Sequence, residues 1–347
     1  MWQFEWMFAG LLSAVFIYLI IKYATKLNFV DIPNERSSHE TPTPKGAGVG
    51  FSLAALITVF LFDFHVFIEN YLLFFAIIIV IITGILDDVY NYSPKFKFLT
   101  LLLAVILMYM DGCTITTLGT YIGYDASLYW LLVFPFTYFA VAGFTNALNL
   151  IDGIDGLAGG VALIILSTLF AIGEMFNDSF IIVVSGSFIF ALIPFMLFNW
   201  NPAKIFMGDS GSLTLGFVIA VLSIKSLAYI NPTVILLIAA IPLLDTFSVI
   251  RRRRQRSLPI FKADKNHLHH ILMGQKQDVP HTAQIIIMLQ FAFALIGYRS
   301  IGQDDTWNII LFAALFQIFF LLFDPRLQKR KKHKHKKNKL NLTKETK

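Results

Sequence analysis

The chain has 347 residues, of which 56% are hydrophobic and 14% are charged, and its mean hydropathy is +0.68. Long apolar runs of this kind indicate transmembrane helices and do not suit β-barrel strands, which would alternate over about 10 residues. The net charge of +6 is accounted for by membrane topology and a basic C-terminal tail, so no nucleic-acid partner is expected.

Eleven apolar segments, separated by short polar gaps, predict an all-α polytopic integral membrane protein with about eleven transmembrane helices. The first segment lacks a basic n-region and a small-residue cleavage site, so we interpret it as a retained span. Residues 1–325 are predicted to form one transmembrane domain, and residues 326–347 a basic cytoplasmic tail. The predicted spans are 5–24, 46–62, 69–86, 98–113, 127–145, 157–175, 180–198, 211–229, 232–250, 283–299 and 306–323.

Charge predicts the orientation of these spans. All but two of the 28 Lys and Arg residues, Lys225 and Arg299, lie in the odd-numbered gaps or in the tail. Because short loops rich in Lys and Arg stay in the cytoplasm, the odd gaps are predicted to be cytoplasmic. We therefore expect the N-terminus outside, the C-terminus in the cytoplasm, and a multi-pass protein of a bacterial inner (plasma) membrane.

The first two cytoplasmic gaps carry basic and acidic groups. Arg36 and Lys45 lie in a loop rich in proline and glycine, where they are candidates to hold phosphate, with simple membrane anchoring as the alternative. Asp87 and Asp88 end an apolar run, and adjacent carboxylates repel each other. A divalent metal or a nearby lysine (Lys95 or Lys97) would compensate them, and a solvated helix end is the alternative.

The third gap has the densest set of polar residues. Asn146, Asn149, Asp152 and Asp155 recur every three residues, a spacing that would gather them along one side of a helix. Glycine follows each of the two aspartates, and it would let the backbone approach a ligand closely. This pattern between two apolar spans predicts a binding site.

The fourth gap runs from Asn199 to Ser212. Its Gly-Asp-Ser-Gly-Ser sequence opens the next helix, where Asp209 would bind a metal or, alternatively, act as a helix cap. Phe206 is a candidate to stack on a base, although an aromatic residue at a membrane boundary is often an interface anchor.

The fifth gap begins with Asp245, continues through an arginine-rich segment and ends with three histidines. His267, His269 and His270 would form a zinc site only with further ligands, and no cysteine lies nearby. Contact with phosphate, or proton transfer by one histidine, is the interpretation we prefer.

Taken in order from Asn34 to about His270, these five motifs resemble those of the polyprenyl-phosphate N-acetylhexosamine-1-phosphate transferases. The His-Leu-His-His motif resembles the branch that transfers N-acetylglucosamine-1-phosphate to undecaprenyl phosphate. Thr41-Pro-Thr-Pro is similar to the branch that makes the first peptidoglycan lipid from UDP-muramoyl-pentapeptide. That enzyme is the alternative within the family, and a secondary transporter is the alternative from another class.

The resemblance implies a membrane enzyme that transfers an N-acetylhexosamine-1-phosphate, with N-acetylglucosamine preferred, from a UDP-sugar to undecaprenyl phosphate and releases UMP. Its product would begin a cell-envelope polysaccharide such as O-antigen, common antigen, teichoic acid or exopolysaccharide. The implied partners are the UDP-sugar, the lipid phosphate, the bilayer and a second copy of the chain in a homodimer.

The resemblance also implies residue roles. Asp209 would be the ligand of Mg²⁺ or Mn²⁺. The implied catalytic residues are Asp87, Asp88, Asp152 and His267. The implied substrate-binding residues are Arg36, Lys45, Asn149, Asp155, Asn199, Phe206, His269 and His270. Asp87 would be the candidate base for the lipid phosphate, Asp155 would recognise uracil and Phe206 would stack on it.

Overall fold

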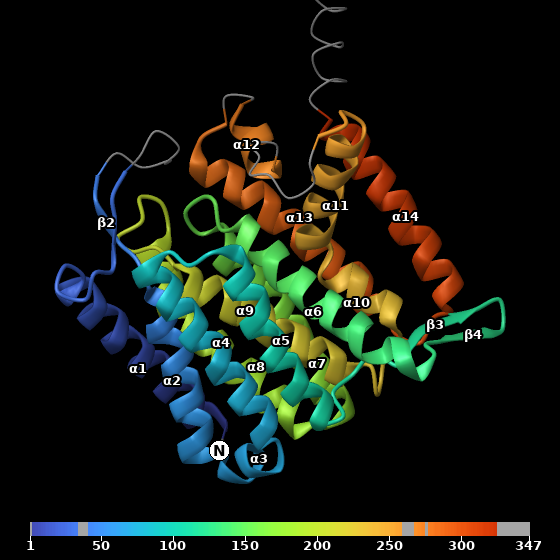
Figure 1. Ribbon diagram of the computed structural model, residues 1–347, viewed down its shortest axis with the longest axis horizontal. Helices are drawn as coiled ribbons and strands as arrows, with labels where there is room; N and C mark the ends of the chain where they lie inside the picture. Colours follow the sequence, from blue (N-terminus) through green and yellow to red (C-terminus); the bar gives the residue numbers. More distant parts are fainter. Residues whose placement is uncertain (1, 34–40, 259–266, 275–276, 325–347) are drawn as a thin grey trace, which may run out of the picture.

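The computed structural model describes residues 2–33, 41–258, 267–274 and 277–324, and these are mostly helical (Figure 1). The first helices are α1 (Trp2–Tyr23), α2 (Ala47–Phe62), α3 (Phe64–Glu69), α4 (Tyr71–Tyr90) and α5 (Pro94–Met110). The middle of the chain forms α6 (Trp130–Ile151), α7 (Leu157–Phe176), α8 (Ser179–Asn199) and α9 (Asp209–Ser226). The last helices are α10 (Pro232–Ile238), α11 (Ala240–Arg254), α12 (Leu268–Met273), α13 (Val279–Arg299) and α14 (Asp305–Leu322). The predicted all-α membrane fold is thus confirmed.

Every predicted span corresponds to helical structure, but the count of eleven spans is not confirmed. In the described part of the chain, seven helices are long and apolar enough to cross a membrane, or eight if a bent pair counts as one. The predicted spans at 46–62, 98–113 and 211–229 become α2, α5 and α9, which are not among the seven. For α9 the reason is its environment: nearly all its side chains are buried by other helices, so it tolerates polar residues that lipid would exclude.

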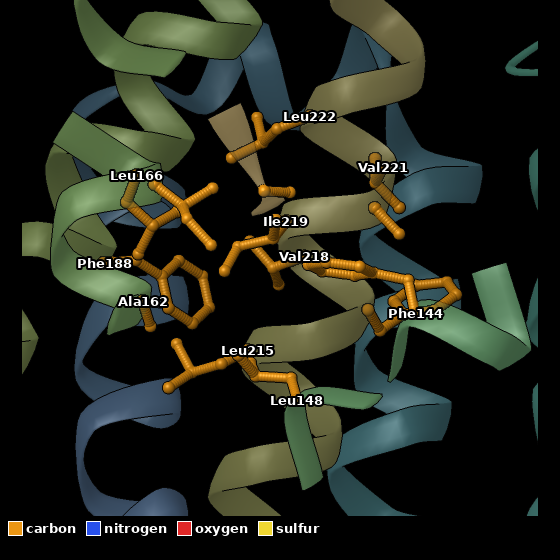
Figure 2. Packing of buried hydrophobic residues seen from close by; sticks show 14 of the residues in the cluster. Phe144, Leu148, Ala162, Leu166, Phe188, Leu215, Val218, Ile219, Val221 and Leu222 are labelled. Atoms are coloured by element: carbon orange, nitrogen blue, oxygen red, sulfur yellow. The ribbon is translucent and has the colours of Figure 1, made fainter. Parts of the chain in front are cut away.

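Helix α9 lies in the middle of the bundle (Figure 1) and packs most closely on α4 and α6. Figure 2 shows apolar side chains of α9 between those of α6 and those of α7 and α8. The labelled residues are Phe144, Leu148, Ala162, Leu166, Phe188, Leu215, Val218, Ile219, Val221 and Leu222. This packing holds α9 between α6 on one side and α7 and α8 on the other.

Two glycines bring the first turn of α9 close to its neighbours. A Cβ atom on Gly48 of α2 would overlap the backbone of Ser210 and Gly211, and one on Gly84 of α4 would overlap the backbone of Asp209 and Ser210. Small residues at helix crossings allow such backbone contact in membrane proteins. Since Gly84 is one turn before Asp87, this contact brings the acidic end of α4 beside Asp209.

The single span predicted at 232–250 is broken, because α10 and α11 meet at an angle of 86°. The side chain of Gln290, buried in α13, makes two hydrogen bonds at the break. Its Nε2 donates to the carbonyl of Ile238 over 2.6 Å, and its Oε1 accepts from the amide of Ile241 over 3.1 Å. These bonds serve backbone groups that would otherwise be unpaired in the membrane interior, so the bend is stable.

Four short strands complete the fold and were not predicted. The pair β1 (Val30–Asp31) and β2 (Thr43–Pro44) is antiparallel and lies near the start of α2. The hairpin of β3 (Thr117–Tyr121) and β4 (Tyr124–Ser127) lies at the other end of α6 from Asp152. Asp305 of α14 holds this hairpin by accepting from the amide of Thr120 over 2.8 Å.

Candidate active site

A cavity of about 350 Å³ lies where the ends of α4 and α6 meet the start of α9. Most of its lining residues are acids and amides that come from four separate polar segments of the sequence. They are Asp31, Lys45, Asp87, Asp88, Asn91, Asn149, Asp152, Gly153, Ile154, Asp155, Asn199, Phe206, Gly208 and Asp209. The structure thus brings together nine of the thirteen predicted site residues: Lys45, Asp87, Asp88, Asn149, Asp152, Asp155, Asn199, Phe206 and Asp209.

Asp88 is bound to the N-terminus of α9. One carboxylate oxygen accepts from the amide of Asp209 over 2.9 Å and the other from the amide of Ser210 over 3.0 Å. The first amides of a helix have no partner within the helix and carry partial positive charge, so a carboxylate stabilises them. The geometry gives Asp88 a structural role between α4 and α9, and its catalytic role stays a prediction.

Asp87 and Asp209 share one cationic partner. The Nζ atom of Lys97, at the start of α5, lies 2.7 Å from Oδ2 of Asp87 and 2.5 Å from Oδ2 of Asp209. Asn149 donates to the other oxygen of Asp209 over 2.7 Å and to Ser212 over 2.8 Å. Lys97 therefore compensates the clustered acids, one of the solutions that the repulsion between Asp87 and Asp88 predicts.

The acids near Lys97 also fit a divalent cation. The Oδ1 atom of Asp87 is buried, and within the described part of the chain it has no hydrogen-bond partner. No three His, Cys, Asp or Glu side chains among the described residues are arranged to hold a metal by themselves. Magnesium needs only one or two carboxylates when phosphates and waters complete its shell. Asp87 and Asp209, which meet at one cation position, satisfy that requirement.

The predicted helical row from Asn146 to Asp155 is wrong in its second half. Helix α6 ends at Ile151, and Asp152 follows it as the first residue of a turn. The helix cannot continue through Gly156, whose φ of +75° is left-handed. Asn149 thus points from a helix, whereas Asp152 and Asp155 belong to a loop, residues 152–156, that forms one wall of the cavity.

Two side chains fasten the loop 152–156 to the segment before α9. Asp155 accepts from the side chain of Asn201 over 2.8 Å and from the amide of Ala203 over 3.0 Å. Asn199 accepts from the amide of Gly156 and donates to the carbonyl of Ile205, each over 2.9 Å. Both the oxygen and the nitrogen of the Asn199 side-chain amide are therefore hydrogen-bonded within the protein, and its predicted contact with substrate stays a prediction.

Asp152 has an unusual electrostatic environment for a carboxylate at the end of a helix. Burial, together with the negative charges of Asp209, Asp88 and Asp155, raises its pKa from 3.8 to about 7. Removing a carboxylate from water and placing it near like charges both favour the protonated form. Asp152 is therefore poised to change its charge near neutral pH.

Lys45 and Phe206 also line the cavity. The amide of Phe206 donates to the carbonyl of Pro44 over 2.8 Å, and the carbonyl of Phe206 accepts from Ala47 over 3.2 Å. These bonds join the segment before α9 to β2 and hold both predicted binding residues near the acids. Arg36 lies outside the described residues.

The histidines do not line the cavity. His267 and His269 are buried, and Nδ1 of His267 lies 2.8 Å from the carboxylate of Asp245. Burial, with the neighbouring His270 ring, lowers the pKa of His269 from 6.5 to about 3, so this ring is neutral near pH 7. The predicted contacts of the histidines with the diphosphate stay predictions.

Three residues at or near the site had no predicted role. Asp31 and Asn91 line the cavity, and Asp245 fastens the histidine segment. Asn91, three residues after Asp88, has a left-handed backbone at the end of α4, a common conformation for Asn at a helix terminus. An Asn at the predicted end of the span, close to the acidic pair, is the sequence signal that could have identified it.

A helix bundle with a carboxylate-lined cavity at one end has the architecture of a membrane-embedded enzyme. Residues 70–227 match the family described as glycosyl transferase family 4. The chain is 32% identical to a probable undecaprenyl-phosphate N-acetylglucosaminyl 1-phosphate transferase of Bacillus subtilis, over 90% of the chain and 87% of that protein. It therefore belongs to glycosyl transferase family 4, and the predicted resemblance to the polyprenyl-phosphate N-acetylhexosamine-1-phosphate transferases is confirmed.

Further relatives carry a similar name, undecaprenyl-phosphate alpha-N-acetylglucosaminyl 1-phosphate transferase. The Yersinia pestis protein is 29% identical over 92% of the chain and 89% of its own length. The protein of Escherichia coli strain K12 is 27% identical over 90% of the chain and 86% of its own length. The similarity thus extends beyond the segment matched by the family and includes the histidine segment.

Proposed function

We propose that the chain transfers N-acetylglucosamine-1-phosphate from UDP-N-acetylglucosamine to undecaprenyl phosphate, releases UMP and so begins a cell-envelope polysaccharide. The observation that carries the proposal is that Asp87 and Asp209 line the cavity and that both direct a carboxylate oxygen at the Lys97 ammonium, so their carboxylates converge on one cation position. The names of the relatives supply the donor sugar and the acceptor lipid.

In the proposed reaction, an oxygen of the lipid phosphate attacks the phosphorus that carries the sugar. A new P–O bond forms there, the anhydride bond to UMP breaks, and UMP leaves with the electron pair. The lipid phosphate is already ionised at neutral pH, so direct attack needs little activation by a base. Phosphoryl transfer then depends mainly on positioning and on neutralising the charge of two anions.

The basic groups of the cavity would neutralise that charge. Lys97 lies between Asp87 and Asp209, and Lys45 lines the cavity. Asp209 and Asp87 would hold Mg²⁺ or Mn²⁺, which when bound offsets the repulsion between the diphosphate and the lipid phosphate. Asn149 orients Asp209 by its hydrogen bond, and Asp87, with one oxygen unpartnered, would orient or deprotonate the lipid phosphate.

The nucleotide would occupy the part of the cavity between the loop 152–156 and Phe206. The ring of Phe206 is the aromatic side chain of the cavity lining, and it offers a face on which uracil would stack. Asp155, held by Asn201 and Ala203, has a fixed position from which to accept a hydrogen bond from the base. Asp152 lies in the same loop as Asp155, and its protonation would respond to the charge of the diphosphate.

We place this cavity at the cytoplasmic face of a bacterial plasma membrane. Lys45, Lys97 and Lys204 lie in the segments around the cavity, and Arg251–Arg254 end α11, the helix that carries Asp245. Positive residues of short loops remain on the cytoplasmic side, where UDP-sugars are found. The N-terminus is then outside.

The test is UMP release by detergent-purified protein given undecaprenyl phosphate, Mg²⁺ and UDP-N-acetylglucosamine. Asp209→Asn and Asp87→Asn are run beside the wild type, and Glu69→Gln, at the exposed far end of α3, is the matched loss of one charge. We expect UMP from the wild type and the control, and a loss of about 100-fold or more in both site variants.

The other functions predict different results in the same experiment. Turnover with UDP-muramoyl-pentapeptide alone would assign the chain to peptidoglycan synthesis. Folded protein that releases no UMP from any UDP-sugar would contradict the proposal, and ion-dependent uptake into vesicles would then identify a transporter.

A further inference from the structure

The backbone conformation at Gly153, in the loop 152–156, does not require a glycine. Gly156 has a left-handed φ of +75°, but Gly153 is not among the residues with positive φ. What keeps Gly153 small is a neighbour: a Cβ atom there would overlap Nε2 and Cε1 of the His269 ring. The loop that carries Asp152 and Asp155 therefore rests directly on His269.

His269 is held firmly in place. Its side chain is 3% exposed and packs against the ring of His270, with the ring centres 4.2 Å apart. The helix that carries it, α12, is fastened to α11 by Asp245. The carboxylate of Asp245 accepts from the amide of Leu268 and pairs with Nδ1 of His267, each over 2.8 Å. A charged group buried with two short hydrogen bonds restrains both partners.

The opposite side of the loop is held by Asn199 and Asp155, which bond it to the segment before α9. The loop is thus clamped between these hydrogen bonds and the His269 ring. Its residues 152–155 line the cavity, whereas His269 does not. His269 therefore meets the cavity wall from behind, at Gly153.

We propose that His269 is a positioning residue, whose ring, fastened through α12 to Asp245, sets where the loop 152–156 places the carboxylates of Asp152 and Asp155. The proposal rests on the proposed function for its effect on turnover, but the contact itself is independent of it. The low pKa of His269 agrees with this role, since a neutral ring adds shape and not charge to the site.

The test is a set of paired substitutions in the full-length protein. Gly153→Ala introduces the overlapping Cβ, and His269→Asn removes the ring atoms that it would meet. His269→Gln is the matched variant, because its longer side chain still reaches about as far as Nε2. Gly143→Ala, inside α6, where a Cβ would meet nothing within 4 Å, controls for replacing a glycine without creating a contact.

Two readouts are taken: the folded fraction and Tm of each variant in detergent, and kcat and KM for UMP release. We expect Gly153→Ala to lower Tm and to reduce kcat/KM roughly 10- to 100-fold, because small displacements of site groups are costly. Adding His269→Asn should restore both quantities to the values of His269→Asn alone. Adding His269→Gln should not, and Gly143→Ala should match the wild type.

Losses that multiply in the Gly153→Ala, His269→Asn double variant would overturn the proposal, since they would mean that the two sites act independently. Equal rescue by His269→Asn and His269→Gln would overturn it as well. If Gly153→Ala does not fold, the folded fraction in the detergent extract still decides, because only the Asn pair should recover it. Rescue of Tm in a protein that releases no UMP would contradict the proposed function and leave the positioning contact standing.

Discussion

Replacing Asp152 by asparagine tests the electrostatics of the cavity through stability alone. The pKa of Asp152 is raised from 3.8 to about 7, so the folded chain binds a proton there that the unfolded chain has released. Stability therefore falls as pH rises from about 4 to about 7, and the full cost is present above pH 7. Since one pKa unit is worth about 1.4 kcal/mol, about 3 kcal/mol accumulates between pH 5 and pH 7.

Asparagine does not titrate and keeps the size of the side chain. We expect Asp152→Asn to raise the Tm of metal-free protein in detergent at pH 8, and to raise it less at pH 5. The difference between the two pH values should be of order 5 °C. Glu69→Gln, at the exposed far end of the bundle, should give the same small change at both. An Asp152→Asn Tm gain that is equal at pH 5 and pH 8, or a Tm loss at pH 8, would refute the electrostatic reasoning.

Three further substitutions test the contacts around the site. Lys97→Met leaves Asp87 and Asp209 without their ammonium partner, which should lower the stability of the metal-free protein by about 3 kcal/mol. In thermal unfolding, adding Mg²⁺ should then raise the Tm of the variant more than that of the wild type. An equal gain in Tm would contradict a shared cation position. Gln290→Leu leaves backbone groups at the helix break unpaired, so chemical unfolding should show a free energy of unfolding lower by about 2 kcal/mol. Unchanged stability would show that the bend does not need the side-chain amide of Gln290. Asp245→Asn replaces one acceptor oxygen that faces the histidine segment by a donor and should cost about 1–3 kcal/mol. Limited proteolysis within residues 267–274 should then speed up, and an unchanged rate would show that Asp245 does not hold this segment.

The helices were predictable from the sequence because lipid demands long apolar runs, and each predicted span corresponds to helical structure. The break between α10 and α11 was not, since it depends on Gln290, 49 residues beyond Ile241. Hydropathy also could not show that α9 is buried by other helices and does not face lipid. Local apolar content cannot distinguish these two environments.

The acids of the cavity were predictable because buried carboxylates beside apolar spans need a functional reason. The residues that pair with these acids were harder to predict. Lys97 was one of two candidate lysines near Asp87, and only the packing of α5 on α4 selects it. The glycines after Asp152 and Asp155 were predicted to let the backbone approach a ligand; Gly153 lines the cavity and adjoins His269, and Gly156 is the N-cap of α7. Contacts between residues more than a hundred positions apart follow from the fold and not from spacing.

Identifying both products of one reaction shows whether the sugar moves to the lipid together with its phosphate. Purified protein is incubated with undecaprenyl phosphate, UDP-N-acetylglucosamine and Mg²⁺, and the lipid and nucleotide are analysed by mass spectrometry. We predict an undecaprenyl diphosphate that carries N-acetylglucosamine, together with an equal amount of UMP, and neither product from Asp209→Asn. An undecaprenyl monophosphate sugar together with UDP would contradict the account, because the sugar would then have moved without its phosphate.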